Sequence, residues 1–210
     1  MAPERRRYLR GLGVVGLVGV AGCTGGSRGS GGADGAGTTD GSGGESDTRP
    51  SGTGGPGVTV VSVDDPPALP VRPTVEVVRE AATDDHPPRL RTTLANERDT
   101  RVRVGEGRAV HFEFVADDAE ALVLLPPGPE YPAAPGCWRL TEGIATTEEY
   151  RTFVIEAGES SARPVDLYAR PGEDACLPVG EHRFETTVSV VSADAEVLSS
   201  AEWGFSVALE

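Results

Sequence analysis

The sequence predicts an all-β protein, an antiparallel β-sandwich of about 8–10 strands that follows a glycine-rich N-terminal segment. From residue 58 onward, apolar side chains recur at every second position. Pro, Gly and Asp separate these short segments, and no convincing amphipathic helix is present. Only 5% of the residues are aromatic, so we expect a core made mostly of Val, Leu and Ala.

The strands are expected wherever the alternation holds. They are predicted at 58–63, 74–79, 90–94, 102–104, 110–114, 121–125, 151–155, 165–167, 184–190 and 201–209. In the last segment Trp203, Phe205 and Val207 alternate with smaller or polar residues, which is typical of a half-buried strand. Ser192–Ala195 separates the last two segments and predicts a terminal hairpin.

Residues 1–22 have the parts of an export signal. Arg5 and Arg6 begin a pattern that continues with an aromatic residue, a leucine and a basic residue, and that resembles the twin-arginine signal of proteins exported in the folded state. The apolar run Gly11–Gly22 is shorter than the roughly 20 residues that a membrane-spanning helix needs. We therefore interpret 1–22 as a signal peptide.

The apolar run ends in small residues before Cys23, a sequence that resembles a lipobox. The alternative is an ordinary core thiol, which the surrounding glycines disfavour. We expect cleavage before Cys23 and attachment of lipid to it, so that membrane lipid is a partner and the protein stands on the outer face of the cell membrane. Residues 23–57, rich in Gly, Ser and Asp, predict a disordered linker with a reach of roughly 30 Å. The β-sandwich domain is expected over 58–210.

The net charge of −14 and a pI of about 4.6 disfavour nucleic acid and anionic lipid headgroups as partners. All basic residues are arginine, and the chain has no lysine. An acid-rich, lysine-free composition resembles that of proteins from salt-loving archaea; a GC-rich genome would favour the same residues.

Cys137 and Cys176 form an even pair once Cys23 is set aside as the lipid site, which predicts a disulfide in an exported chain. Such a bond would close a loop of about 40 residues and stabilise the fold by roughly 4 kcal/mol. It would hold Pro126–Gly136 and Trp138 against Pro171–Gly180. The alternatives are a metal pair or two buried thiols, although no histidine pattern supports zinc.

No catalytic, metal-binding or cofactor-binding residues are predicted. His86, His111 and His182 lack partners at ligand spacing and are expected on the surface. The acidic pairs do not fit a calcium loop and are expected to be solvated: Asp64-Asp65, Asp84-Asp85, Asp117-Asp118 and Glu148-Glu149. Residues 158–162 lack the final glycine and the following helix of a nucleophile elbow, so a strand–turn–strand is expected there.

Two further stretches, Gly136–Leu140 and Asp174–Phe184, together with the N-terminal signal and linker, resemble exported lipoproteins of unknown function from halophilic archaea. The second stretch also resembles the entry to a late strand of immunoglobulin-like modules, such as bacterial proteinase-inhibitor-like domains. The resemblance implies an immunoglobulin-like sandwich at the cell surface, although the Cys–Trp–Cys spacing of antibody domains is absent.

Two classes of function follow. The first is a non-catalytic binding or structural module that holds an unknown cell-surface protein or another partner. The alternative is a proteinase-inhibitor-like or hydrolytic domain that acts on extracellular peptides. An enzyme needs a deep pocket with converging polar groups, whereas a binding module needs only grooves. The sequence leaves the partner and the oligomeric state open.

Overall fold

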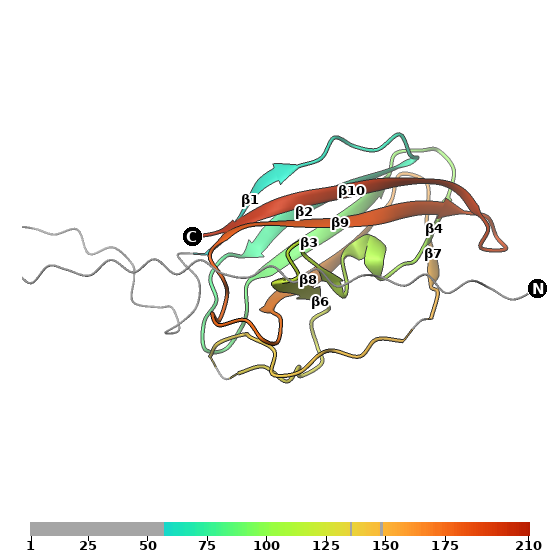
Figure 1. Cartoon of the computed structure of the whole chain (residues 1–210). Coiled ribbons are helices and arrows are strands. Elements are labelled where there is room, and N and C mark those ends of the chain that lie inside the picture. The colour runs from blue at the N-terminus through green and yellow to red at the C-terminus, as the bar shows by residue number, and fades with distance from the viewer. Residues whose placement is uncertain (1–56, 135, 148) are drawn as a thin grey trace, which may run out of the picture. The chain divides into compact units, whose positions relative to one another are not determined.

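The structure is a computed structural model that describes residues 57–134, 136–147 and 149–210. The predictions for Arg5, Arg6 and Cys23, and for the linker as far as residue 56, lie outside the described residues. Within them the chain forms two antiparallel sheets of five strands that pack face to face (Figure 1). No helix in the described part is long and apolar enough to cross a bilayer.

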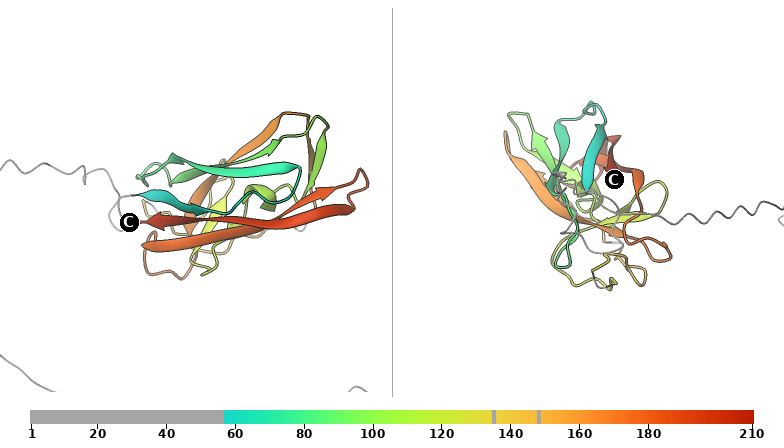
Figure 2. Two further views of the ribbon diagram at one scale, coloured as in Figure 1. Left: turned by 90° about the horizontal axis from the view of Figure 1, so that it is seen from above. Right: turned by 90° about the vertical axis from the view of Figure 1, so that its left-hand side faces the viewer.

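Each sheet combines strands from distant parts of the chain. The first sheet has the order β1-β10-β9-β4-β7, made by Val58–Val63, Val197–Leu209, Gly180–Val191, Val102–Gly105 and Thr152–Ile155. The second has the order β2-β3-β8-β6-β5, made by Val71–Arg79, Arg89–Asn96, Ser160–Ala169, Leu122–Leu125 and Val115–Ala116. Figure 2 shows the two layers from two further sides.

The strand order confirms the immunoglobulin-like sandwich. Strand β3 lies beside β8 in one sheet, and β9 lies between β4 and β10 in the other. Among its changes of sheet, the chain passes from one sheet to the other between β3 and β4 and between β8 and β9. Strands B and E, and strands C, F and G, have these relations in immunoglobulin domains.

The core lies between the sheets and is organised by the β9–β10 hairpin. Phe184 on β9 stands directly opposite Phe205 on β10, and both are fully buried. Trp203 and Phe112 pack against Phe205, with ring centroids 6.1 and 4.8 Å from it. Burying each such side chain contributes about 1.5–3 kcal/mol. The remaining core is mostly Val and Leu, as expected.

Asp64, the first residue after β1, fastens this edge strand to the hairpin. Its carboxylate accepts hydrogen bonds from the Arg183 guanidinium at 2.7 and 3.1 Å and from the Gly204 amide at 2.9 Å. The Trp203 indole N–H donates to the Asp64 carbonyl. The hydrogen bond from Arg183 lowers the pKa of Asp64. The contact with Arg183 joins residues that are 119 positions apart in the chain.

The strand predictions are confirmed except at 110–114. There the chain forms a short 3-10 turn, Ala109–His111, and Phe112 and Phe114 adopt positive φ. Val110, His111 and Phe112 are all buried, because the turn packs against β3 of one sheet and β9 of the other. A strand would have placed His111 on the opposite face from its neighbours. The short edge strand β5 was not predicted.

Candidate functional site

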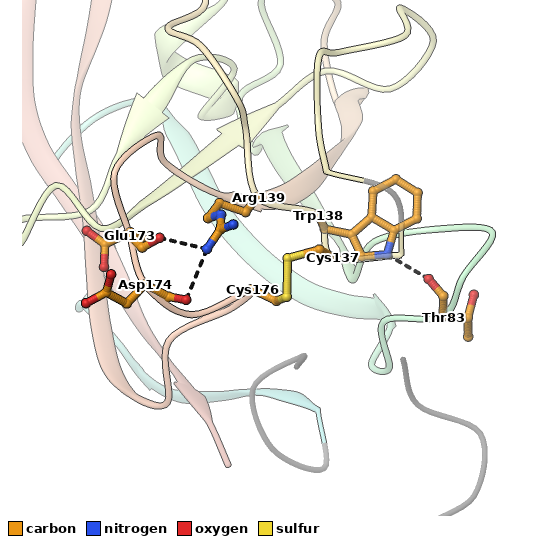
Figure 3. Close-up of a disulfide and its surroundings, with 7 residues drawn as sticks. All are labelled: Thr83, Cys137, Trp138, Arg139, Glu173, Asp174 and Cys176. Atoms are coloured by element: carbon orange, nitrogen blue, oxygen red, sulfur yellow. Dashed lines mark hydrogen bonds between the residues drawn. A yellow bond between two sulfur atoms is a disulfide. The ribbon is translucent and has the colours of Figure 1, made fainter. Parts of the chain in front are cut away.

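Cys137 and Cys176 are joined by a disulfide, as predicted, and their Cα atoms are 4.8 Å apart (Figure 3). This separation lies within the range of about 4.4–6.8 Å typical of disulfides. The bond links the segment between β6 and β7 to the segment between β8 and β9. Two long connections that have few sheet hydrogen bonds are therefore held together covalently.

Hydrogen bonds on both sides of the disulfide extend this anchor (Figure 3). The indole N–H of Trp138 donates to the carbonyl of Thr83 at 2.7 Å, which attaches the β2–β3 loop. The Arg139 guanidinium donates to the carbonyls of Glu173 and Asp174 at 2.9 and 3.0 Å. Three connections that are distant in sequence thus meet around one covalent bond.

A hollow of about 630 Å³ lies where the β2–β3 and β6–β7 connections meet the second sheet. We call it the aromatic hollow, because Tyr131, Trp138 and Tyr168 are among its lining residues. Tyr168 comes from strand β8, whereas Tyr131 and Trp138 come from the β6–β7 connection. A volume of this size is typical of small-molecule sites.

The three rings have a defined arrangement. Tyr131 and Trp138 stand at 70° and 79° to the plane of Tyr168, with centroids 5.5 and 6.0 Å from it. The Tyr131 hydroxyl donates to the carbonyl of Pro126 at 2.8 Å. Burial raises the pKa of both tyrosines to about 12, so both phenols are uncharged. Two of the three polar groups are therefore engaged with backbone carbonyls, which leaves ring surfaces to line the hollow.

Charged groups surround these rings. The Arg89 guanidinium forms a bidentate pair with the buried Asp166 carboxylate, at 2.6 and 2.8 Å, and this pairing raises the pKa of Arg89. The other charged lining residues are Arg79, Asp84, Asp85 and Glu130. Among the lining residues, carboxylates outnumber guanidinium groups by two, so the hollow has a net negative charge.

His86 also lines the hollow. Its Nδ1 is the only buried side-chain nitrogen or oxygen without a hydrogen-bond partner among the described residues. Leaving such an atom unpaired costs about 1–3 kcal/mol. The prediction of a surface loop histidine is therefore only partly right, because one side of this ring is buried.

The surface prediction for His111 is wrong, because the side chain is fully buried between the sheets. Its Nδ1 lies 3.0 Å from the Thr92 hydroxyl, and its Nε2 lies 2.9 Å from the Ser161 hydroxyl. Burial, together with the nearby positive charge of Arg163, lowers the pKa of His111 to about 4. The imidazole is therefore neutral at pH 7, and it stacks on Phe153.

The pair formed by Ser161 and His111 resembles a nucleophile and its base, but its surroundings do not favour catalysis. The third partner is the hydroxyl of Thr92 rather than a carboxylate. Neither Ser161 nor His111 lines the aromatic hollow. Ser161 follows a turn and lies on β8, as the strand–turn–strand prediction requires. We interpret the pair as a structural connection inside the sandwich.

The surface prediction for His182 and the solvated prediction for Asp117 are also wrong. Asp117 is 2% exposed and accepts hydrogen bonds from the Leu122 amide at 2.8 Å and from Nδ1 of His182 at 2.8 Å. The Nε2 of His182 faces the carbonyl of Pro178. These bonds tie β9 to the β5–β6 turn. The neighbouring Asp118, and Asp84 and Asp85, are exposed as predicted.

A second, smaller hollow of about 380 Å³ lies between Phe114, Leu125, Leu140 and Ile144. Most of its lining residues have apolar side chains, and its charged lining residue is Arg170. Among the described residues, no group of three or more His, Cys, Asp or Glu side chains could hold a metal ion. The aromatic hollow brings together more kinds of recognition group and is the stronger candidate.

No protein-family model matches the chain, and a search of curated proteins found no match. The site therefore has to be interpreted from its own geometry. Sequence reasoning identified the disulfide and Trp138, but it missed Tyr131, Tyr168 and the Arg89–Asp166 pair. The available signal was an aromatic residue, Tyr131, within a proline-rich loop next to the paired Cys137.

Loss of the disulfide is expected to destabilise the domain. Replacing both Cys137 and Cys176 by serine should lower the free energy of unfolding by about 2–5 kcal/mol, since the unfolded chain regains the freedom of a long loop. Denaturant unfolding with and without reductant measures the loss, and the double variant should not respond to reductant. Wild-type protein that unfolds identically in both conditions would contradict the expectation.

The low pKa of His111 predicts a loss of stability in acid. The unfolded histidine has a pKa near 6.5 and the folded one a pKa of about 4, so the unfolded chain binds more protons between these values. The contribution is complete above pH 6.5 and is lost as the pH falls towards 4. At pH 5 the free energy of unfolding should be lower than at pH 7.5 by about 2 kcal/mol from this residue.

The variant His111→Phe isolates this effect. Phenylalanine keeps a buried ring but cannot be protonated, and the hydrogen bonds that it loses affect both pH values alike. The drop in stability between pH 7.5 and pH 5, measured by urea unfolding, should therefore be smaller in the variant by about 2 kcal/mol. An equal drop in both proteins would show that His111 does not contribute.

Proposed function

We propose that this protein is a non-catalytic binding module at the outer face of the cell membrane, anchored by lipid on Cys23, and that its ligand occupies the aromatic hollow. The observation that carries the proposal is the hollow of about 630 Å³, which is lined by three aromatic rings and braced by a disulfide. A binding site benefits from loop residues that are already held in place. Loop residues that became ordered only on binding would lose conformational entropy, and this loss would lower the affinity.

The features outside the hollow support the same proposal. A disulfide is typical of proteins that leave the reducing cytosol. The arginine pair Arg5-Arg6, the short apolar run and Cys23 support export and lipid attachment. The acidic, lysine-free composition supports a haloarchaeal source. The ligand is either free in the surroundings or displayed on a cell-surface molecule such as a protein.

A binding role is favoured over the hydrolase or inhibitor role by the chemistry of the hollow. The residues that line the hollow include no serine, cysteine or threonine that could act as a nucleophile. The carboxylate of Asp166 has both oxygens bound by Arg89, so it is not free to act as a base. The remaining lining carboxylates, Asp84, Asp85 and Glu130, are exposed to solvent, and the aromatic rings supply apolar surface for a ligand.

The anchoring part of the proposal is tested by replacing the anchor residue. In the native cell, Cys23→Ala is expected to move the protein from the membrane fraction to the medium, since the remaining chain would have no lipid. Mass spectrometry of the purified wild type should show a mass excess of lipid on Cys23. Equal masses, apart from the substitution, and equal membrane retention would contradict the prediction.

The binding part is tested with the full chain and three probes of different chemistry: maltose, the dipeptide Ala-Ala, and choline. At least one should give saturable heat in titration calorimetry, and Tyr131→Leu should weaken that binding tenfold or more. Tyr150→Leu is the matched control, because Tyr150 is exposed and does not line the hollow. Saturable binding that is insensitive to Tyr131→Leu, or no binding of any probe, would contradict a role for the hollow.

A further inference from the structure

We infer that the aromatic hollow recognises an organic cation, specifically a methylated or quaternary ammonium group. The inference rests on the proposed function and goes beyond it by assigning the chemical class of the ligand. It depends on three properties of the lining: the arrangement of the rings, the balance of charge, and the hydrogen bonds that several of the lining donors already make to protein acceptors.

The rings provide the first argument. Tyr131 and Trp138 each stand nearly perpendicular to Tyr168, at centroid distances of 5.5 and 6.0 Å. Rings in more than one orientation can surround a rounded group on several sides, which a parallel stack cannot do. Aromatic faces carry negative electrostatic potential and attract cations within about 6 Å of the ring centroid. Quaternary ammonium groups are recognised by such sets of rings.

The charges provide the second argument. Arg89 and Asp166 neutralise each other through two short hydrogen bonds. The remaining charged lining residues are the carboxylates Asp84, Asp85 and Glu130 and the single guanidinium of Arg79. All three of these carboxylates are exposed, so they can attract a cation from solution without a large cost of burial. The net negative charge of the lining therefore favours a positively charged ligand over an anion.

The donors provide the third argument, which separates an organic cation from a sugar. Three of the donors at the lining, the Trp138 N–H, the Tyr131 hydroxyl and the Arg89 guanidinium, already donate to protein acceptors; Arg79, His86 and the Tyr168 hydroxyl also line the hollow. A sugar needs both donors and acceptors for its hydroxyl groups, and leaving them unpaired reduces its affinity. A quaternary ammonium group makes no strong hydrogen bonds, so ring faces and nearby carboxylates are sufficient for it.

An inorganic ion fits this lining less well. Calcium requires six to eight oxygen ligands at about 2.3–2.6 Å. In the described residues, no three acidic, histidine or cysteine side chains are grouped closely enough to hold a metal ion. The exposed carboxylates come from two separate connections, Asp84 and Asp85 from one and Glu130 from the other.

The decisive experiment compares choline with 3,3-dimethylbutan-1-ol, a neutral molecule of the same shape, by titration calorimetry on the full chain. Both titrations use the same ionic strength, with sodium chloride and calcium chloride as inorganic controls. Choline should bind at least tenfold more tightly than the neutral molecule, because only choline carries the charge. Equal binding of the two would show that the hollow is merely apolar and would overturn the inference.

Variants of lining residues test whether choline binds in the hollow. Tyr131→Leu should weaken choline binding tenfold or more, whereas Tyr131→Phe should retain it, because the ring remains and the lost hydroxyl faces Pro126. Glu130→Gln should weaken binding several-fold, and Glu196→Gln, an exposed residue at the β9–β10 turn, should not. Thermal unfolding of each variant checks that the fold persists. If Tyr131→Leu leaves the affinity for choline unchanged, both the inference and the proposed site are wrong.

The remaining outcomes separate this inference from the proposed function. If maltose or Ala-Ala binds in a manner that depends on Tyr131 and choline does not bind, the hollow is a binding site but the cation assignment is wrong. If calcium chloride produces the saturable heat and choline does not, the acidic residues bind an inorganic ion and the inference fails. If none of the probes binds, both the inference and the proposed function fail.

Discussion

The rest of the first sheet depends on the register of the β9–β10 hairpin. Strand β1 pairs with β10, β4 pairs with β9, and β7 reaches the sheet through β4. Phe184 and Phe205 face each other across the hairpin and are fully buried together with Trp203. A shift of one residue would turn these rings to the outer face, because side chains alternate along a strand. Asp64 reinforces this register, since it binds Arg183 on β9 and the backbone of Gly204 on β10.

The aromatic hollow depends on a different kind of constraint. The β6–β7 connection has few strand hydrogen bonds, so the sandwich alone would leave it free to adopt many conformations. The Cys137–Cys176 bond, the Trp138–Thr83 hydrogen bond and the bonds of Arg139 fix it at successive residues. Tyr131 is then held against Tyr168, which belongs to β8. The hollow thus combines one ring from the rigid sheet with two rings from a covalently anchored connection.

The buried polar groups show how far local sequence can mislead. Asp117 and His182 stand beside charged residues in sequence, and His111 falls on the polar face of the strand predicted at 110–114, so all three were expected at the surface. In the structure each is buried and hydrogen-bonded to a group far from it in the chain, such as Ser161 for His111 and Asp117 for His182. A buried polar side chain is tolerable only when such a partner exists. The partner is a property of the fold and cannot be deduced from neighbouring residues.

The sequence by itself determined the all-β class, most of the strand positions, the terminal hairpin and the pairing of Cys137 with Cys176. Alternation of apolar residues and the spacing of turn residues are local signals, and the two cysteines within the predicted domain have one way to pair. The segment around Phe112 escaped prediction because a 3-10 turn packed between the sheets has the same apolar alternation as a strand. Only the tertiary structure brought Tyr131, Trp138 and Tyr168 together with Asp84, Asp85 and Glu130. These residues come from three separate parts of the chain, and their meeting depends on sheet order and on the disulfide, neither of which leaves a local pattern in the sequence.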